Sequence, residues 1–150
     1  MKAKAFVTKR GDRNLDIGAG KHMLGTEYLA KERGVENVRY DPFNIDKATN
    51  LEAINLLKGG ERFPTATIPN VLNTIKEKGV RSNVIHQAAR AIDKDGTAYF
   101  QMHVDPKKIG EAGQTSKTDW QNQMRPEDYI PEVKKWFREV ELKSTSSGKN

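Results

Sequence analysis

Apolar and polar positions alternate along the chain with two different periods. Short apolar runs closed by a turn residue predict strands, and apolar positions every three or four residues predict helices. This pattern predicts strands over 15–20, 35–40, 65–70, 97–104 and 140–142, the first of them running into a glycine-rich turn. Helices are predicted over 23–33, 50–57, 71–78, 82–92 and 126–138. Strands that alternate with helices predict an α/β fold, with a mostly parallel twisted sheet and helices on both faces.

The chain is expected to hold one domain, because 150 residues suit a single hydrophobic core. We place a basic arm over 1–13, the domain over 14–143 and a flexible polar tail over 144–150. Inside the domain, residues 105–125 are polar and follow no period, which predicts a long loop.

Composition narrows the classes of partner. The 26 Lys and Arg residues outnumber the 20 Asp and Glu residues, and the net charge of +6 favours a partner that carries phosphates or acids. Without cysteine the chain has no disulfide, no thiolate metal site and no cysteine nucleophile.

The chain lacks the run of ~18 apolar residues that a membrane helix needs, and its first residues lack the apolar core of a secretory signal. We therefore expect a soluble, cytoplasmic protein with no membrane partner. His22, His86 and His103 are too scattered to predict a metal site.

The glycine-rich end of the first predicted segment, 15–20, holds the main chemical signal. Its sequence is Asp16-Ile17-Gly18-Ala19-Gly20. Glycine has no Cβ, so the backbone of Gly18 and Gly20 can take unusual angles and approach a ligand closely. The helix predicted after the turn offers unpaired N–H groups and a partial positive charge to a carboxylate or another anion. The alternative is a tight turn that binds nothing.

Asp41 ends the second predicted strand, 23 positions after Gly18. An acid at this place can accept hydrogen bonds from the two hydroxyls of a ribose. Pro42 and Phe43 would then offer a flat apolar surface to the base. Together with the glycine turn, these residues indicate a cofactor that contains a nucleoside, bound at the C-terminal edge of a parallel sheet. An ordinary Asp-Pro turn is the alternative.

The charge of Asp16 separates two classes of cofactor. A dinucleotide fingerprint has a third glycine where this chain has Met23, and Asp16 would repel a pyrophosphate. A carboxylate instead suits S-adenosylmethionine, which carries a positive amino group and no phosphate. No Gly-Lys-Ser/Thr sequence follows the turn, so a P-loop is excluded. A nicotinamide-dependent oxidoreductase is kept as a weaker alternative.

Three segments in order resemble class I S-adenosylmethionine-dependent methyltransferases. Leu15 to Gly20 (LDIGAG) is similar to their Asp/Glu-x-Gly-x-Gly motif, and Tyr40 to Phe43 (YDPF) is similar to the segment with the acidic residue after strand two. Ile68 to Ile75 (IPNVLNTI) resembles the segment SNVLNVI after strand four in some bacterial and phage-associated members. The resemblance spans about residues 14–104 and is to a small bacterial or phage-type member.

This resemblance implies a Rossmann-like methyltransferase fold with S-adenosylmethionine as the cofactor. The cofactor-binding candidates are Asp16, Gly18, Ala19, Gly20 and His22 around the methionine moiety, Asp41 at the ribose, Pro42 and Phe43 at the adenine, and Pro69, Asn70 and Val71 beside the methyl group. His22 stands where the family has its third glycine. Only 23 residues separate Asp41 from Thr65, so we expect a sheet trimmed in the third-strand region. One predicted strand follows the last helix where the family has two, so the C-terminus is expected to be trimmed as well.

Asn70 and His103 are the catalytic candidates. Asn70 could orient an acceptor amine or cap a helix that begins at Val71. His103 ends a strand at the same edge of the sheet and could act as a general base or have a structural role. Trp120, in the polar loop, could stack on a base or anchor the loop to the domain.

The predicted function is transfer of a methyl group from S-adenosylmethionine to an acceptor. Nucleic acid is a candidate acceptor because of the net charge, and the oligomeric state is not predicted. The alternative is a module of the same fold that binds S-adenosylmethionine or nucleic acid without turnover. The basic arm and the expected trimming of the sheet favour this alternative.

Overall fold

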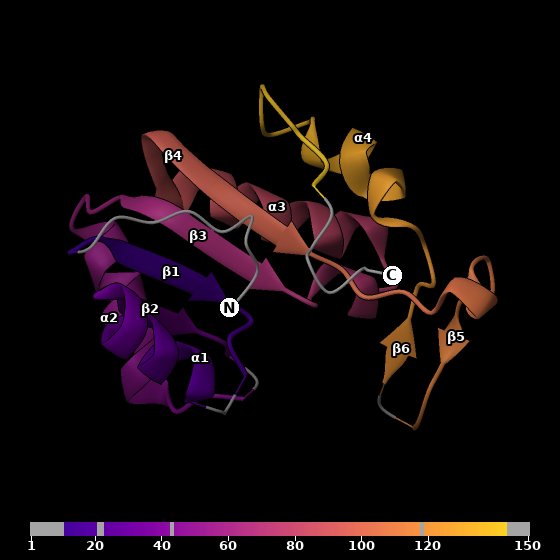
Figure 1. The fold of residues 1–150 in the computed structure, drawn as a ribbon, viewed down its shortest axis with the longest axis horizontal. Coiled ribbons are helices and arrows are strands. Elements are labelled where there is room, and N and C mark those ends of the chain that lie inside the picture. The colour runs from indigo at the N-terminus through magenta and orange to yellow at the C-terminus, as the bar shows by residue number, and fades with distance from the viewer. Residues whose placement is uncertain (1–10, 21–22, 43, 118, 144–150) are drawn as a thin grey trace.

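The computed structural model describes residues 11–20, 23–42, 44–117 and 119–143 (Figure 1). Its strands are β1 (Arg13–Ile17), β2 (Glu36–Tyr40), β3 (Phe63–Pro69), β4 (Ile92–Gln101), β5 (Gly113–Gln114) and β6 (Trp120–Gln121). Its α-helices are α1 (Leu24–Tyr28), α2 (Lys47–Lys58), α3 (Lys78–Ala91) and α4 (Ile130–Val133). None of the helices in this part of the chain combines the length and the apolar composition that crossing a membrane requires. Most of the predicted arm and the whole predicted tail lie outside the described residues.

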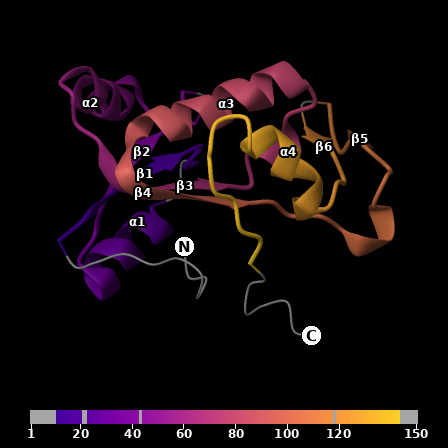
Figure 2. The ribbon, with the colours of Figure 1, turned by 90° about the horizontal axis from the view of Figure 1, so that it is seen from above.

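The first four strands form one parallel sheet in the order β2-β1-β3-β4. Leu15 of β1 pairs with Val38 of β2 on one side and with Ala66 of β3 on the other. The chain therefore moves from β1 to one side and later continues on the other, so the switch point lies between β1 and β3. Ligands of open α/β sheets bind outside the carboxyl ends of the strands at such a point. Helices α2 and α3 lie on one face and α1 on the other (Figure 2), which confirms the predicted α/β fold.

The sheet is short on both sides, as the predicted trimming implies. Between β2 and β3, the described chain forms α2 and no strand. After β4, the strands β5 and β6 pair only with each other, as an antiparallel ribbon. The predicted strand over 140–142 is wrong, because no strand forms there and Val140 packs against the apolar cluster around Tyr129 instead.

The two faces of the sheet differ in chemistry. The face toward α2 and α3 carries the main core, which contains Leu15, Ile17, Val38, Ala53, Phe63, Ala66, Ile68, Ala88 and Ala91. Alternate residues of the same strands point to the opposite face. There Asn14, Asn37, Thr65 and Thr67 are buried although they are polar. The α1 side of the sheet therefore combines these buried polar side chains with a small apolar cluster that contains Leu29, Val35, Tyr28 and Tyr99.

The predicted helix over 71–78 is wrong. Leu72–Thr74 forms a single 3-10 turn, and α3 begins later. The side-chain amide of Asn122 donates to the carbonyls of Leu72 at 2.8 Å and Ile75 at 3.0 Å. An α-helix would use these carbonyls for its own N–H groups, so Asn122 takes the place of the helical partners.

The segment over 105–125, predicted as a loop, is partly regular. It contains a 3-10 turn at Pro106–Lys108 and the β5–β6 ribbon. The indole N–H of Trp120 donates to Asn122 Oδ1 at 2.7 Å, and Lys76 Nζ lies 4.8 Å from the centre of the ring. These contacts favour Trp120 as an anchor that holds the ribbon to the domain.

Two further elements differ from their predicted extents. The predicted helix over 126–138 is a 3-10 turn at Pro126–Tyr129 followed by the short α4. Strand β4 starts directly after α3 and ends at Gln101 rather than at 104. Asp95 and Gly96 lie inside β4 at a bulge, because the pairing with β3 shifts register there.

Candidate functional site

The glycine turn lies between the end of β1 and the segment that follows β3. Gly18 has a φ of +73°, and its N–H donates to the carbonyl of Tyr40 at 2.8 Å. A Cβ on Gly18 would overlap Cγ2 of Val71. Both the backbone angle and the close approach of Val71 therefore require glycine, and they place the turn at the switch point.

Gly20 is fixed by β2 and by the residue that follows it. Its N–H donates to Asp41 Oδ2 at 3.0 Å, and its carbonyl accepts a hydrogen bond from Arg39 Nη2 at 2.7 Å. Its φ is +71°, and a Cβ placed on it would meet nothing within 4 Å. The backbone of Gly20 is thus held from one side and has open space on the side of the missing Cβ.

Asp41 is buried directly after β2, with 5% of its surface exposed. Besides Gly20, its carboxylate accepts hydrogen bonds from the backbone N–H of Asn44 at 3.2 Å and from Asn44 Nδ2 at 2.9 Å. Its own N–H and carbonyl pair with the side chain of Asn50 in α2, at 2.8 and 3.1 Å. Asp41 therefore organises both the glycine turn and the turn that leads into α2. Pro42 beside it is exposed.

Asp16 belongs to a buried polar network on the α1 side of the sheet. Its Oδ1 accepts from the hydroxyl of Thr67 and its Oδ2 from Asn37 Nδ2, both at 3.2 Å. Asn14 closes the ring by donating to Asn37 Oδ1 at 2.7 Å and to Thr67 Oγ1 at 2.9 Å. Burial raises the pKa of Asp16 above its ordinary 3.8, although these hydrogen bonds and the guanidinium of Arg39 act in the opposite direction.

The raised pKa of Asp16 predicts a pH dependence of stability. The folded chain keeps this proton to a higher pH than the unfolded chain does. The stability that Asp16 contributes is therefore full below pH 3.8 and is lost as the pH rises through the folded pKa. We expect Asp16→Asn to remove this loss. The free energy of unfolding of the variant, relative to that of the wild type, should therefore increase as the pH rises. Urea denaturation of both proteins over a pH series measures the difference, and a constant difference would contradict the expectation.

Asn70 follows β3 in a left-handed backbone conformation, with a φ of 55°. Its N–H donates to the carbonyl of Gln101 at the end of β4, at 2.7 Å. Its side chain is exposed and makes no hydrogen bond within the described part of the chain. The predicted cap is wrong, because no α-helix begins at Val71. A non-glycine residue in this conformation costs of order 1–3 kcal/mol, and such residues cluster at functional sites.

Most of the described candidates meet at one edge of the sheet. Gly18 packs against Val71, and the N–H of Gly20 donates to Asp41. Pro69 pairs in register with Gln101, whose carbonyl accepts the N–H of Asn70. Ala19 lies half-buried between the two glycines. His103 is exposed two residues beyond β4 and makes no hydrogen bond to these residues in the described chain. The remaining candidates, His22 and Phe43, lie outside the described residues. In the same part of the chain, no three acidic or histidine side chains are grouped as metal ligands would be.

Arg39 and Asn44 are contacts of this site that the sequence analysis missed. Arg39 supports the carbonyl of Gly20, pairs in register with Asp16 across β1 and β2, and donates to Met23 Sδ. Strand alternation could have identified Arg39, because Arg39 stands two residues before Asp41 and side chains two residues apart along a strand point to the same face. Asn44 carried no such signal, because its role depends on the turn after Asp41.

Comparison with solved structures finds a likeness to phosphoethanolamine N-methyltransferase 2 of Haemonchus contortus, in complex with S-adenosyl-L-methionine. The TM-score is 0.54 with 18% sequence identity, over 86% of this chain and 33% of that one. The chain thus spans about a third of the length of that enzyme. No protein-family model matches the sequence, and no curated protein is similar to it. The likeness establishes a Rossmann-like methyltransferase fold for the part of the chain that it covers.

Proposed function

We propose that the chain binds S-adenosylmethionine at the switch point between β1 and β3 and transfers its methyl group to an acceptor. The observation that carries the proposal is the glycine turn, in which Gly20 is bonded to Asp41 and leaves open space above its backbone. The fold supports it, because a similar fold holds this cofactor in the enzyme described above. Nucleic acid is the candidate acceptor, on the ground of the net charge of +6. The bacterial or phage origin that Ile68–Ile75 suggests stays a prediction.

The described residues fit such a cofactor, since a side chain at position 20 would fill the space that glycine leaves open. The bound cofactor supplies an activated methyl group, and the chain has to bind and orient it. The assignments are Asp16, Gly18, Ala19, Gly20 and His22 at the methionine moiety, Asp41 at the ribose, Pro42 and Phe43 at the adenine, and Pro69, Asn70 and Val71 near the methyl group.

On the acceptor side, we assign the orienting role to Asn70 and the role of base to His103. Asn70 suits the orienting role because its amide is exposed and has no partner in the described chain. An amide offers both donors and an acceptor, so it can orient an amine or a hydroxyl. His103 is exposed two residues beyond the neighbouring strand β4, and histidine is the side chain that most often serves as a general base.

Binding at Asp41 requires an exchange of hydrogen bonds. A carboxylate offers about four lone-pair sites. Three hydrogen bonds from Gly20 and Asn44 already occupy the Asp41 carboxylate. A ribose diol that donates two more must therefore displace at least one of these donors. Asn44 is exposed and is the donor that can move away into solvent.

The second candidate function is a module that binds the cofactor or nucleic acid without turnover. The observation that favours it is that the chain itself already supplies donors to the carboxylates of both Asp16 and Asp41. Calorimetric titration with S-adenosylmethionine, followed by a methyl-transfer screen against nucleic acids, proteins and small molecules, separates the two functions. Binding with transfer supports the enzyme, and binding without transfer to any of these acceptors supports the module.

Gly20→Ala tests whether the open space over the turn holds the cofactor. We expect the affinity for S-adenosylmethionine to fall by about 5- to 150-fold, as for a methyl group forced into an occupied space. Gly11→Ala is the matched control, because Gly11 also has a positive φ, +91°, and nothing within 4 Å of an added Cβ. Both variants should lose similar stability from backbone strain. Equal cofactor affinity in both variants and the wild type would contradict the placement.

A further inference from the structure

A face remote from the glycine turn combines exposed cations with an exposed aromatic ring. It is formed by one side of α3 and by the segment that follows α4, and the two lie together in both views (Figures 1 and 2). A buried ion pair between Arg81 of α3 and Glu132 of α4 joins the two elements. We call this surface the α3 face; its residues are Lys78, Ser82, His86, Arg90, Lys134, Lys135, Trp136 and Arg138.

Two contacts with α3 hold Trp136 in a fixed orientation on the α3 face. Its ring stacks on His86, with centroids 3.8 Å apart and planes 12° apart. Its indole N–H donates to Ser82 Oγ at 3.0 Å. Even so, 42% of Trp136 remains exposed. The structure therefore presents a pre-oriented aromatic ring at the surface.

The charges that α3 and the segment 134–138 contribute to this face have one sign. Helix α3 contains no Asp or Glu, and Lys78 and Arg90 stand one turn before Ser82 and one turn after His86. The segment 134–138 adds Lys134, Lys135 and Arg138, again with no acid among them.

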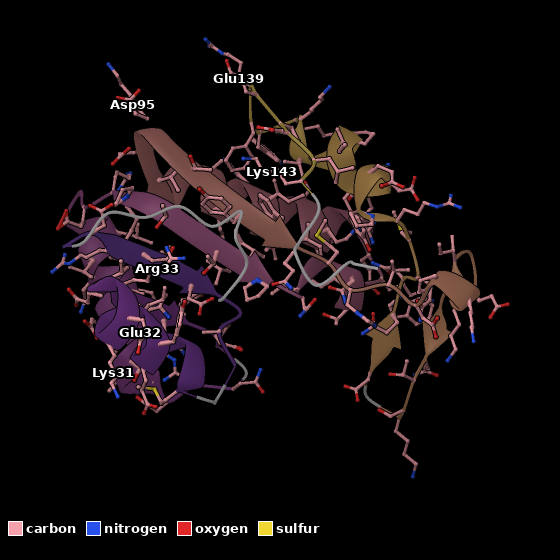
Figure 3. All side chains as sticks on the ribbon, in the orientation of Figure 1. Lys31, Glu32, Arg33, Asp95, Glu139 and Lys143 are labelled. Carbon is pink, nitrogen blue, oxygen red and sulfur yellow. The ribbon has the colours of Figure 1, made fainter. Side chains whose placement is uncertain are left out.

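None of these five cations forms an ion pair within the described chain. Glu139, the next residue in sequence, lies on the loop beyond α4 at the outer edge of the molecule (Figure 3). The described residues as a whole hold as many acids as bases, so the α3 face is a local imbalance.

We infer that the α3 face binds single-stranded nucleic acid. Exposed lysines and arginines attract the phosphates, and the free side of a fixed aromatic ring accepts a stacked base whatever its identity. A base stacked on Trp136 would extend the stack of His86 and Trp136. The indole is already held in place, so binding would not have to order it. This site is separate from the glycine turn, so binding should not require S-adenosylmethionine.

The test measures fluorescence anisotropy of a labelled oligothymidylate with the full chain, without cofactor, over a series of salt concentrations. Trp136→Leu should weaken binding by about 5- to 150-fold, as expected for one lost stacking contact. Lys134→Ala with Lys135→Ala should reduce the slope of log affinity against log salt by about 1.4. The control is Lys31→Ala with Lys58→Ala, two exposed lysines near α1 and at the end of α2; Figure 3 shows Lys31 far from α4. The control should change neither quantity.

Three results would overturn the inference. The first is no binding by the wild type at low salt, and the second is a loss in the control as large as in the α3-face variants. The third is unchanged affinity of Trp136→Leu together with equal competition by polyglutamate, which would indicate an acidic protein partner. Because the measurement contains no cofactor, a failure of cofactor binding leaves its outcome unaffected.

Discussion

Replacing Glu132 with Ala is expected to lower the free energy of unfolding by about 3–5 kcal/mol, because it leaves a buried guanidinium without its counter-charge. Arg81 Nε and Nη2 donate to the two oxygens of Glu132 at 2.9 and 3.1 Å, and each side chain is 7% exposed. Arg81 Nη1 also donates to the carbonyls of Ile75 and Lys76, at 2.8 and 2.9 Å. The pair therefore fixes α4 to α3 and to the segment before it. Urea denaturation monitored by circular dichroism measures the loss.

Two variants make this experiment specific. Glu127→Ala removes the acid of an exposed pair, 3.9 Å from Arg125, and should cost less than about 1 kcal/mol. Arg81→Met combined with Glu132→Leu removes both charges and should recover much of the stability that Glu132→Ala loses. A loss in Glu132→Ala no larger than in Glu127→Ala would show that the pair does not hold the two elements together.

Gly18→Ala is expected to destabilise the fold by about 2–5 kcal/mol, the sum of left-handed backbone strain and overpacking. The new Cβ would overlap Cγ2 of Val71, and the φ of +73° is unfavourable for alanine. The displaced Val71 belongs to the segment after β3, so the candidate site should be distorted as well. Thermal and urea unfolding give the magnitude.

The comparison with Gly60 separates the two causes. Gly60 also has a positive φ, +90°, but an added Cβ there meets nothing within 4 Å. Gly60→Ala should therefore show backbone strain alone, about 1–2 kcal/mol. Adding Val71→Ala to Gly18→Ala should relieve the overlap. The double variant should therefore lose less stability than the sum of the losses in the two single variants. Equal losses at Gly18 and Gly60 would contradict close packing at the turn.

The parts of the fold that the sequence predicts are those in which local pattern and long-range structure agree. Strands β1 and β2 alternate apolar and polar residues, and they end directly before Gly18 and Asp41. Gly34 stands directly after the helix predicted over 23–33, and it ends the helical turn after α1 with a φ of 64°. Because parallel strands end at the same edge, correct strand ends were enough to bring Asp41 close to the glycine turn.

The C-terminal third resists prediction because distant polar side chains determine its structure. Asn122 bonds to carbonyls about 50 residues earlier and so replaces the helix that the pattern over 71–78 predicts. The ion pair between Arg81 and Glu132 spans 51 residues. Neither partner of such a contact carries a periodic signal. A polar segment can therefore read as a loop and still fold against the domain.

The polar network around Asp16 shows a similar limit at the candidate site. The sequence predicted that Asp16 would end a buried strand, and it does lie in β1. It gave no sign that Asn37 and Thr67, on two different strands, would donate to that carboxylate. Their contribution follows from the strand order β2-β1-β3, which brings three polar residues side by side. A site residue can be identified from its position in a strand, whereas its hydrogen-bond partners depend on the register of the neighbouring strands.

Asp41→Ala tests whether Asp41 and the glycine turn hold S-adenosylmethionine. The matched control is Asp46→Ala, which removes an exposed carboxylate five residues away that caps α2 through the N–H of Thr49. Asp46→Ala should lower the stability through the lost helix cap without changing cofactor binding.

Isothermal titration calorimetry of S-adenosylmethionine with the wild type and these two variants is the most direct measurement. The proposed function predicts that the wild type and Asp46→Ala bind S-adenosylmethionine alike. Asp41→Ala should lose about 1.5–3 kcal/mol of binding free energy, as for lost hydrogen bonds to a charged group. Equal affinity in all three proteins, or no binding by the folded wild type, would contradict it.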